Sequence, residues 1–306
     1  MPDVWACSVI VPQNVKDKPG VTREPPKKRT RAQEARAMKS GADVEAEIKS
    51  KAGKVFLDMF GGSGRVSTAM SSEHKRPAIN LEIKEGYDLT QGPVQVSIIR
   101  CIRDQKVHGF HLAPPCSTFS RARRGRRCPK AGGGWPRALR CKEHPWGMQM
   151  AMSLKEQMHL KAGNSCLQAS LRALRAGRAK RLPRGLEQPR SSLMWEIPEL
   201  KEEMADAIVV QADMCGFGAR WRKPTQVALW DIADPVAARK FLHKRCRSKR
   251  AQKGQPMLCG HTKLPHEILS GVHDPKAKHR PRSNFKTKAA QEYPMGFAKE
   301  LAQALA

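Results

Sequence analysis

The chain has 306 residues, and its 57 lysines and arginines outnumber 28 aspartates and glutamates to give a net charge of +29. This length can bury the core of one mixed α/β domain, and the charge favours phosphate binding, with an unspecific basic surface as the alternative. No apolar run approaches the roughly 18 residues of a membrane span, and no signal peptide is recognisable at the start. These features exclude a membrane protein and predict a soluble intracellular one.

Residues 1–32 are rich in proline and poor in apolar side chains, which predicts a disordered basic arm. Its segment Pro25–Arg31 resembles a nuclear localisation signal, although contact with nucleic acid or solvation explains a short basic cluster equally well. Nine cysteines without the spacing of a disulfide framework indicate reduced thiols. We therefore expect a nuclear protein, or otherwise a cytoplasmic one.

Residues 33–230 carry the pattern of an α/β domain. A helix is expected over Gln33–Lys51, interrupted by Gly41, and a short apolar strand over Lys54–Asp58. A glycine-rich turn over Met59–Gly64 then leads into a helix over Arg65–Met70. A strand, a glycine turn and a helix N-terminus form a pocket whose backbone can approach a nucleotide-like ligand closely.

The next strand is expected over Ala78–Ile83, followed by a helix over Gln95–Asp104. Glu82 lies about 18 residues beyond the glycine turn, close to where dinucleotide-binding folds carry a ribose-binding carboxylate. Asp88 follows in a loop. Either carboxylate could instead be a solvated loop charge, and this alternative is stronger for Asp88.

A buried strand is expected over Val107–Ala113, and Pro114 and Pro115 end it. Cys116 is thereby held at the carboxyl end of a strand, where ligands bind in open α/β sheets. Because arginines follow closely, we expect a lowered pKa for the thiol and treat Cys116 as a candidate nucleophile. A buried structural cysteine is the alternative.

The chain is strongly basic from Arg121 to Lys142, which predicts a flexible loop that closes over a polyanion, or else a disordered insertion. The candidate nucleic-acid contacts are Ser120, Arg121, Arg123, Arg124, Arg126 and Arg127. Two helices are expected within Met148–Lys180, split near Gly163 and Asn164.

A basic strand is expected over Ala179–Leu186, leading into Glu187 and Gln188, and a helix over Glu199–Met214. Arg220 and Arg222 precede a short strand over Gln226–Trp230. In an extended segment their side chains point the same way, which suits gripping a pyrimidine and its phosphate, with plain surface charge as the alternative.

Residues 231–288 form a short, very basic region, and residues 289–306 form an amphipathic C-terminal helix whose apolar face is expected to pack on the α/β domain. His261 lies within a group of cysteines and histidines that includes enough ligand types for a small zinc site. The expected ligands are His243, Cys246, Cys259 and His266. Their spacing matches no standard finger, so solvated side chains are the alternative.

Several of these motifs together resemble the cytosine-C5 DNA methyltransferases. Pro114-Pro115-Cys116 with Phe119 and Ser120 resembles the family's Pro-Cys motif, with Ser117 where glutamine is usual. Asp58-x-Phe60-x-Gly62-x-Gly64 resembles the S-adenosylmethionine-binding motif of Rossmann-like methyltransferases, and Glu187-Gln188-Pro189 resembles Glu-Asn-Val or Glu-Asn-Pro. The order of motifs over residues 54–230 is the order in the family.

The resemblance implies an α/β fold, namely a Rossmann-like methyltransferase sheet with helices on both faces, plus a small basic recognition segment at residues 231–288. It implies an enzyme that uses S-adenosylmethionine and binds DNA, and we expect this enzyme to be a monomer. Zinc is a further candidate cofactor because of the cysteines and histidines named above. The implied cofactor-binding residues are Asp58, Phe60, Gly62, Gly64, Glu82, Asp88 and Pro114.

The resemblance also implies that Cys116 adds to C6 of a flipped-out cytosine while Glu187 contacts N3. Arg220 and Arg222 resemble the paired arginines of the target-base pocket. Two alternatives stay open: a nucleic-acid-binding protein on a decayed methyltransferase fold, favoured by Ser117 and Gln188, and an RNA cytosine-C5 methyltransferase.

Overall fold

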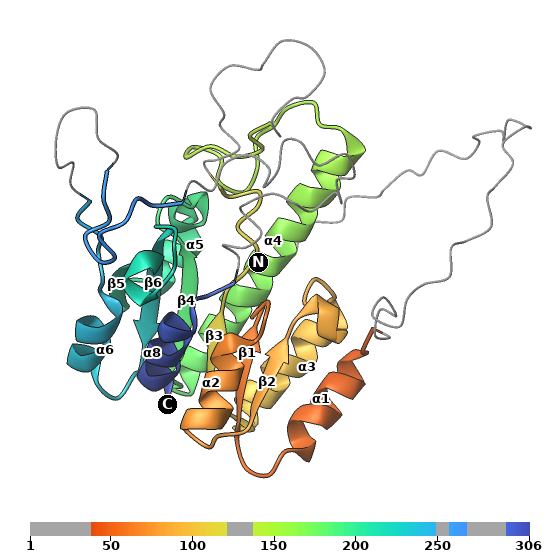
Figure 1. The fold of residues 1–306 in the computed structure, drawn as a ribbon. Helices are drawn as coiled ribbons and strands as arrows, with labels where there is room; N and C mark the ends of the chain where they lie inside the picture. Colours follow the sequence, from red (N-terminus) through yellow and green to blue (C-terminus); the bar gives the residue numbers. More distant parts are fainter. Residues whose placement is uncertain (1–37, 121–136, 249–256, 268–291) are drawn as a thin grey trace, which may run out of the picture. The chain divides into compact units, whose positions relative to one another are not determined.

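A six-stranded sheet in the order β2-β1-β3-β4-β6-β5 organises the chain (Figure 1). The computed structural model describes residues 38–120, 137–248, 257–267 and 292–306. Strands β1 to β4 run parallel, and β6 pairs antiparallel with both β4 and β5. The strands are β1 (Val55–Met59), β2 (Ala78–Leu81), β3 (Val107–Leu112), β4 (Arg184–Pro189), β5 (Ile208–Asp213) and β6 (Pro224–Trp230).

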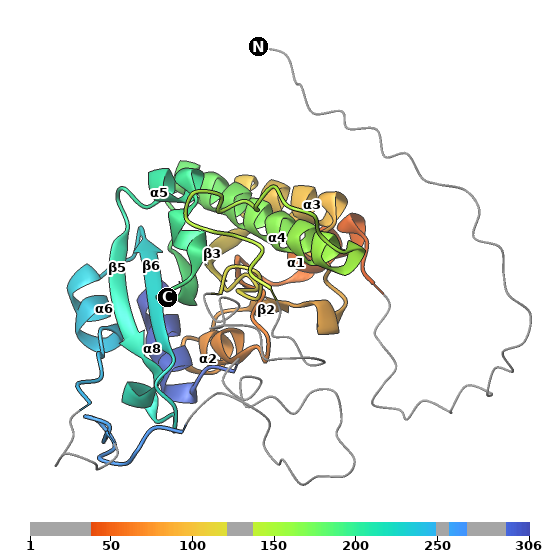
Figure 2. The same cartoon turned by 90° about the horizontal axis from the view of Figure 1, so that it is seen from above.

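Helices cover both faces of this sheet, which confirms the predicted fold class (Figure 2). One face carries α1, α3, α4 and α5, and the other carries α2, α6 and α8. The helices are α1 (Gly41–Ser50), α2 (Arg65–Glu73), α3 (Gly92–Arg103), α4 (Leu154–Ala179), α5 (Pro198–Glu203), α6 (Pro235–Leu242) and α8 (Met295–Leu305). Among the described residues, no helix is long and apolar enough to cross a membrane.

Alternating side chains of the strands supply two separate cores. In β6, Ala228 and Trp230 belong to the core under α3 and α4, whereas Val227 and Leu229 belong to the core under α2 and α8. This period of two is the geometry of a strand covered on both faces. The central strands are therefore locked in register, because a slip of one residue would exchange the two cores.

The order of the strands reverses beside β1. The chain goes from β1 to β2 on one side and then crosses back to β3 on the other side of β1. The crevice outside the carboxyl ends of strands at such a switch point is where open α/β sheets bind ligands. The glycine-rich turn follows the carboxyl end of β1, and the turn that carries Cys116 follows the carboxyl end of β3.

The expected break in the helices near Gly163 is wrong, since α4 is one continuous helix of 26 residues. Ser153 starts α4 with a capping box that includes Glu156. Gly163 serves packing instead: a Cβ there would lie 2.6 Å from Thr118 Oγ1, so only glycine lets α4 approach the loop after Cys116.

The expected helix over Glu199–Met214 is wrong in its second half. Only α5 is helical, and the chain then forms β5, which pairs with β6 over its whole length. The β-branched run Ile208-Val209-Val210 favours a strand, and tertiary pairing decides the state of this segment. The predicted strand over Ala179–Leu186 begins after Pro183, while Arg184 is buried and ion-paired with Asp231.

Other boundaries move by a few residues. The first helix begins at Gly41, which is its first helical residue and not an interruption, with Ser40 as the N-cap. The arm at residues 1–32 and residues 33–37 of that expected helix lie outside the described residues, as do residues 249–256 and 268–288 of the basic region. Helix α6, inside the basic region at residues 231–288, contributes buried Ala238 and Leu242 to the core shared with α8.

Candidate active site

The turn after β1 is bent by left-handed residues. Phe60, Gly62 and Gly64 have φ values of 60°, 58° and 68°. Left-handed backbone suits glycine and strains a residue such as phenylalanine, so packing must hold Phe60 in place. The Phe60 amide donates to the Leu81 carbonyl at 3.0 Å, which ties the turn to β2.

Glu82 reaches this turn from the end of β2. Its Oε2 accepts a hydrogen bond from the Gly62 amide at 3.1 Å, and Asn80 Nδ2 donates to the Gly62 carbonyl at 3.3 Å. A Cβ placed on Gly62 would meet nothing within 4 Å, so this side of the turn is open. The structure thus brings the predicted glycine turn and the predicted ribose carboxylate together.

Asp58 is fully buried under the turn. Its Oδ2 accepts from the Ser67 amide at 3.1 Å in the first turn of α2, and its Oδ1 lies 2.9 Å from Nδ1 of buried His111. The carboxylate therefore caps the helix that starts after the glycine turn. This contact supports the shape of the turn from below.

Asp88 lies in the loop before α3, where it organises the backbone. Its carboxylate accepts from the Thr90 amide, the Thr90 hydroxyl and the Gln91 side chain. Burial alone would raise the pKa of Asp88, but these hydrogen bonds outweigh it and hold the pKa below its usual range. All these partners are local, which is the behaviour of a loop carboxylate.

The Pro-Pro-Cys turn is held by hydrogen bonds from neighbouring strands. The Ala113 amide donates to the Met59 carbonyl at 3.0 Å, and the Gln188 side-chain amide donates to the carbonyl of buried Pro114. Gln188 is itself held by the Ser192 hydroxyl at 3.1 Å. Gln188 thus links β4 to the turn that presents Cys116.

The residues after Cys116 are anchored by a buried arginine. Arg140 donates to Thr118 Oγ1 at 3.0 Å, and its guanidinium lies 3.7 Å from the centroid of the Phe119 ring. The Phe119 amide donates to the Cys116 carbonyl at 3.0 Å. Cys116 is therefore set in a rigid turn and is half-buried, with exposed Pro115 and Ser117 on either side.

Glu187 projects from β4 into a buried polar cluster. The side chain is 6% exposed, its Oε2 accepts from the Tyr293 hydroxyl at 3.0 Å, and Oε1 lies 3.8 Å from Lys223 Nζ. Tyr293, which precedes α8, is buried, and its ring lies edge-on to His111. Burial and the neighbouring charges of Glu187 and Asp58 raise the pKa of Tyr293 well above its usual value, so the hydroxyl is a permanent donor.

The pKa of the Cys116 thiol is raised, contrary to the lowered pKa that the sequence predicts. Burial is the main cause and the negative charge of Glu187 adds to it, while Lys223 acts in the opposite direction. Arg121, Arg123, Arg124, Arg126 and Arg127, from which the lowered pKa was expected, lie outside the described residues. Ser120 is half-buried at the edge of that gap.

Neither predicted arginine points at Glu187. Arg222 Nε donates to buried Asp213 at 3.0 Å, and the Arg220 side chain is 86% exposed, 3.9 Å from Glu267. Among the described residues, Lys223 is the cation that pairs with Glu187, because it directly precedes β6 beside the carboxyl end of β4. The segment is bent and not extended, since Arg220 and Trp221 lie in a bend and Lys223 has a φ of 31°, so the strand spacing assumed for the two arginines does not hold.

The structure also gathers a different set of candidate metal ligands from the predicted one. Cys215, Cys246, Cys259 and His261 have ligand atoms within 4.8 Å of one another. His266 Nε2 lies 3.6 Å from Cys246 Sγ, outside this group of four. His243 is exposed, and its Nδ1 faces the amide of Gln211 at 3.5 Å, so a backbone contact accounts for it.

No family model and no curated protein matches the sequence. The chain is similar in structure to the Entamoeba histolytica methyltransferase EhMeth, with 10% identity and a TM-score of 0.33 over 71% of this chain and 58% of that one. It is also similar to the S. pombe Dnmt2 methyltransferase, with 10% identity and a TM-score of 0.34 over 67% and 57%. The chain spans less than two thirds of the length of either protein. Both similar structures are methyltransferases, but similarity this low leaves the chemistry of this chain to its own residues.

Sequence reasoning missed four side chains that the structure places in the two candidate sites. Lys223 adjoins the predicted arginines, His111 and Tyr293 lie in no motif, and Cys215 is distant in sequence from the other cluster cysteines. Only Lys223 had a signal, namely its place between Arg222 and a strand-starting proline. The others are brought in by the sheet order and by the return of the chain at α8.

Proposed function

We propose that this chain is an S-adenosylmethionine-dependent methyltransferase acting on C5 of cytosine in DNA. The observation that carries the proposal is the placement of Cys116 after β3 beside Glu187 at the end of β4, next to the glycine turn after β1. A nucleophilic thiol and a carboxyl group at one edge of the sheet are the two groups that cytosine activation needs.

The residues around the glycine turn fit the cofactor. The open side of Gly62 leaves room for close backbone approach, and Glu82 offers a carboxylate at the same place. Asp58 supports the turn from beneath and caps α2. When bound there, S-adenosylmethionine would supply a methyl group on a positively charged sulfur. Of the seven expected cofactor-binding residues, Asp88 has the weakest support because its carboxylate is already occupied by local donors.

The reaction assigns one bond or proton to each residue. As the Cys116 thiol ionises and its sulfur bonds to C6 of a flipped-out cytosine, Glu187 takes up a proton from the thiol or from solvent and passes it to N3, so that C5 becomes nucleophilic. Once C5 is methylated, water takes the C5 proton as the bond between C6 and sulfur breaks, and the N3 proton returns to Glu187, which restores the neutral ring and the side chains. Because the resting thiol is held protonated by its surroundings, substrate binding has to supply the base or the charge that ionises it.

Lys223 and Tyr293 are positioning residues in this scheme. Each contacts a different oxygen of Glu187, so the two contacts together restrict the rotation of the carboxyl group. A fixed carboxyl loses little entropy when it meets the base. Arg222 binds Asp213 and thereby supports the loop that ends at Lys223, so we assign it no contact with the substrate.

The decisive experiment is covalent trapping with 5-fluorocytosine. Fluorine at C5 blocks the elimination that releases the thiol, so the purified protein should form a stable adduct with DNA when S-adenosylmethionine is present. Cys116→Ser should form none, and Cys141→Ser, which alters another half-buried thiol, should still form it. An adduct that persists in Cys116→Ser would refute the assignment.

The same assay run on RNA separates the substrates. The net charge of +29 supports a polyanion, and affinity should fall steeply as salt rises. Trapping on RNA alone would replace DNA by RNA in the proposal. No trapping on either, with cofactor binding intact, would instead indicate a nucleic-acid-binding protein on this fold.

Cofactor binding has its own test at Gly62. Gly62→Val should weaken S-adenosylmethionine binding at least about 10-fold in calorimetry, because the side chain fills the open side of the turn. Gly53→Val is the matched control, since Gly53 also has a positive φ and open surroundings but lies before β1. Equal affinities in both variants would place the cofactor elsewhere.

A further inference from the structure

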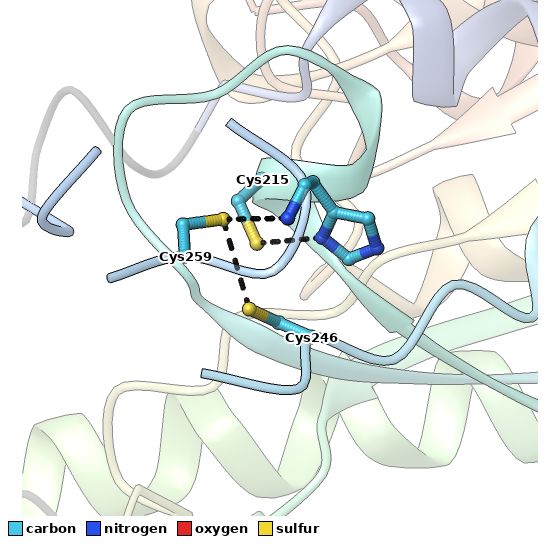
Figure 3. Close-up of side chains that lie close together, drawn as sticks. Cys215, Cys246 and Cys259 are labelled. Carbon is cyan, nitrogen blue, oxygen red and sulfur yellow. Dashed lines mark hydrogen bonds between the residues drawn. The ribbon is translucent and has the colours of Figure 1, made fainter. Parts of the chain in front are cut away.

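Three buried thiols meet at the edge of the sheet that carries β5. Cys215 lies in the short 3₁₀ helix η5 (Met214–Phe217), Cys246 follows α6, and Cys259 lies in the described segment Met257–Glu267. Figure 3 shows the three side chains pointing toward one another. They form a buried cluster of their own, apart from the two main cores.

The distances within this cluster match a tetrahedral metal site. With Zn–S near 2.3 Å and Zn–N near 2.0–2.1 Å, the edges of the tetrahedron should be about 3.8 Å between sulfurs and about 3.6 Å between sulfur and nitrogen. Cys246 Sγ and Cys259 Sγ lie 3.7 Å apart, and Cys215 Sγ lies 3.4 Å from His261 Nδ1. All four ligand atoms lie within 4.8 Å of one another.

Backbone amides around the sulfurs are arranged as they are around thiolates. The amides of His261 and Thr262 point at Cys259 Sγ at 3.3 and 3.4 Å, and the amide of Gly260 points at Cys246 Sγ at 3.4 Å. Such donors stabilise negative charge on the sulfur and orient the ligands of a metal. A Cβ on Gly260 would lie 2.7 Å from the Arg247 carbonyl, so glycine is required for this approach.

Besides the cluster, the segment that carries Cys259 and His261 is held by polar contacts, including the Glu267 amide, which donates to the Arg220 carbonyl at 2.9 Å. A small turn closes on itself through the Cys259 amide and the Leu264 carbonyl at 2.9 Å, and Met257 and Leu264 are exposed. Three buried thiols supply little apolar area, whereas a bound metal ion can contribute folding free energy directly.

We propose that Cys215, Cys246, Cys259 and His261 bind one structural zinc ion. Three thiolates and one imidazole in a tetrahedron are a preferred donor set for zinc. The site joins three segments that are distant in sequence. It also adjoins the loop that ends at Lys223, since Asp213 Oδ2 accepts from both the Cys246 amide and Arg222.

The first test measures zinc in the full-length protein purified under reducing conditions. We expect about one zinc per chain, and chelation should lower the unfolding midpoint by about 5 °C or more. Cobalt substituted for zinc should give the visible and near-ultraviolet bands of a tetrahedral thiolate site. Less than about a tenth of a zinc per chain, together with no cobalt–thiolate band, would overturn the proposal.

Variants identify the ligands. Cys246→Ser should lose the metal, whereas Cys166→Ser, which alters a buried cysteine of α4, should keep it. His261→Ala should weaken zinc binding about 10-fold or more, and His266→Ala should not. The reverse result for the two histidines would refute the choice of His261. If Cys246→Ser does not fold, the cobalt spectrum of the unmodified protein still decides, and a Cys246–Cys259 disulfide in non-reducing peptide mapping would refute the site.

Discussion

Cysteine is used in two opposite ways in this molecule. Cys116 stands as a single thiol in a rigid turn between the central strands, with a carboxylate beside it and a raised pKa. Cys215, Cys246 and Cys259 stand together at the end of the sheet, each within reach of another sulfur or an imidazole. The first arrangement keeps one thiol available for a substrate. In the second, the thiols contact one another and could together bind a metal.

The two regions also differ in the contacts that hold their cysteines in place. The Cys116 turn is held by hydrogen bonds from two buried side chains, Gln188 of β4 and Arg140. The thiol cluster is surrounded by short connections and by backbone amides. A reactive group thus sits on rigid strands, while a metal would itself supply the rigidity that the connections lack.

Replacing one cysteine in each region by serine gives the largest expected effects. Cys116→Ser should abolish trapping of 5-fluorocytosine while the unfolding midpoint stays within about 2 °C. Cys259→Ser should lower the midpoint by about 5 °C or more yet still trap the base at a temperature where the protein is folded. Thermal unfolding and denaturing gels measure both. Parallel loss of both properties in each variant would mean that the two regions are one unit.

Glu187→Gln should reduce the rate of trapping by about 100-fold, since it removes the proton donor to N3 and keeps the shape. Tyr293→Phe removes only a contact to Glu187 and should cost about 10-fold. Rapid-mixing measurements of adduct formation would rank the two variants. A larger effect for Tyr293→Phe would assign the proton transfer to the tyrosine hydroxyl.

Gly163→Ala tests how tightly α4 holds the Cys116 turn. Alanine normally stabilises a helix interior by up to about 1 kcal/mol over glycine, but a Cβ here would meet Thr118 Oγ1 at 2.6 Å. We expect a net loss of about 1–2 kcal/mol in the free energy of unfolding. Gly92→Ala in α3 has nothing within 4 Å and should be neutral or slightly stabilising. Denaturant titration of both variants decides.

The pH dependence of Cys116 alkylation gives the smallest but most specific signal. Because the folded-state pKa is raised, the rate should keep rising with pH beyond the range of an ordinary thiol. Glu187→Gln removes a negative neighbour and should move the profile to lower pH, whereas Lys223→Met should move it higher. Mass spectrometry with iodoacetamide follows Cys116 against Cys141. Shifts in the same direction would contradict the arrangement around Glu187.

Local patterns in the sequence predicted the parts of the site that are contiguous in the chain. The turn Asp58–Gly64, the Pro-Pro-Cys turn and Glu187 each combine a strand end with a turn residue, and the sheet places all of them at one edge. The helix split at Gly163 and the helix through Ile208 failed because a packing contact or a strand partner decided the state. Periodicity carries no information about either contact.

The sequence by itself determined the α/β sheet, the order of the motifs and the identity of the candidate nucleophile and acid, because these depend on residues adjacent in the chain. Tertiary structure alone decided that Lys223 and Tyr293 hold Glu187, that Arg222 binds Asp213, and that burial raises the pKa of Cys116. It also decided that Cys215 and His261 join Cys246 and Cys259. Such contacts join residues far apart in the chain, and only the sheet order and its side-chain register specify which of them meet.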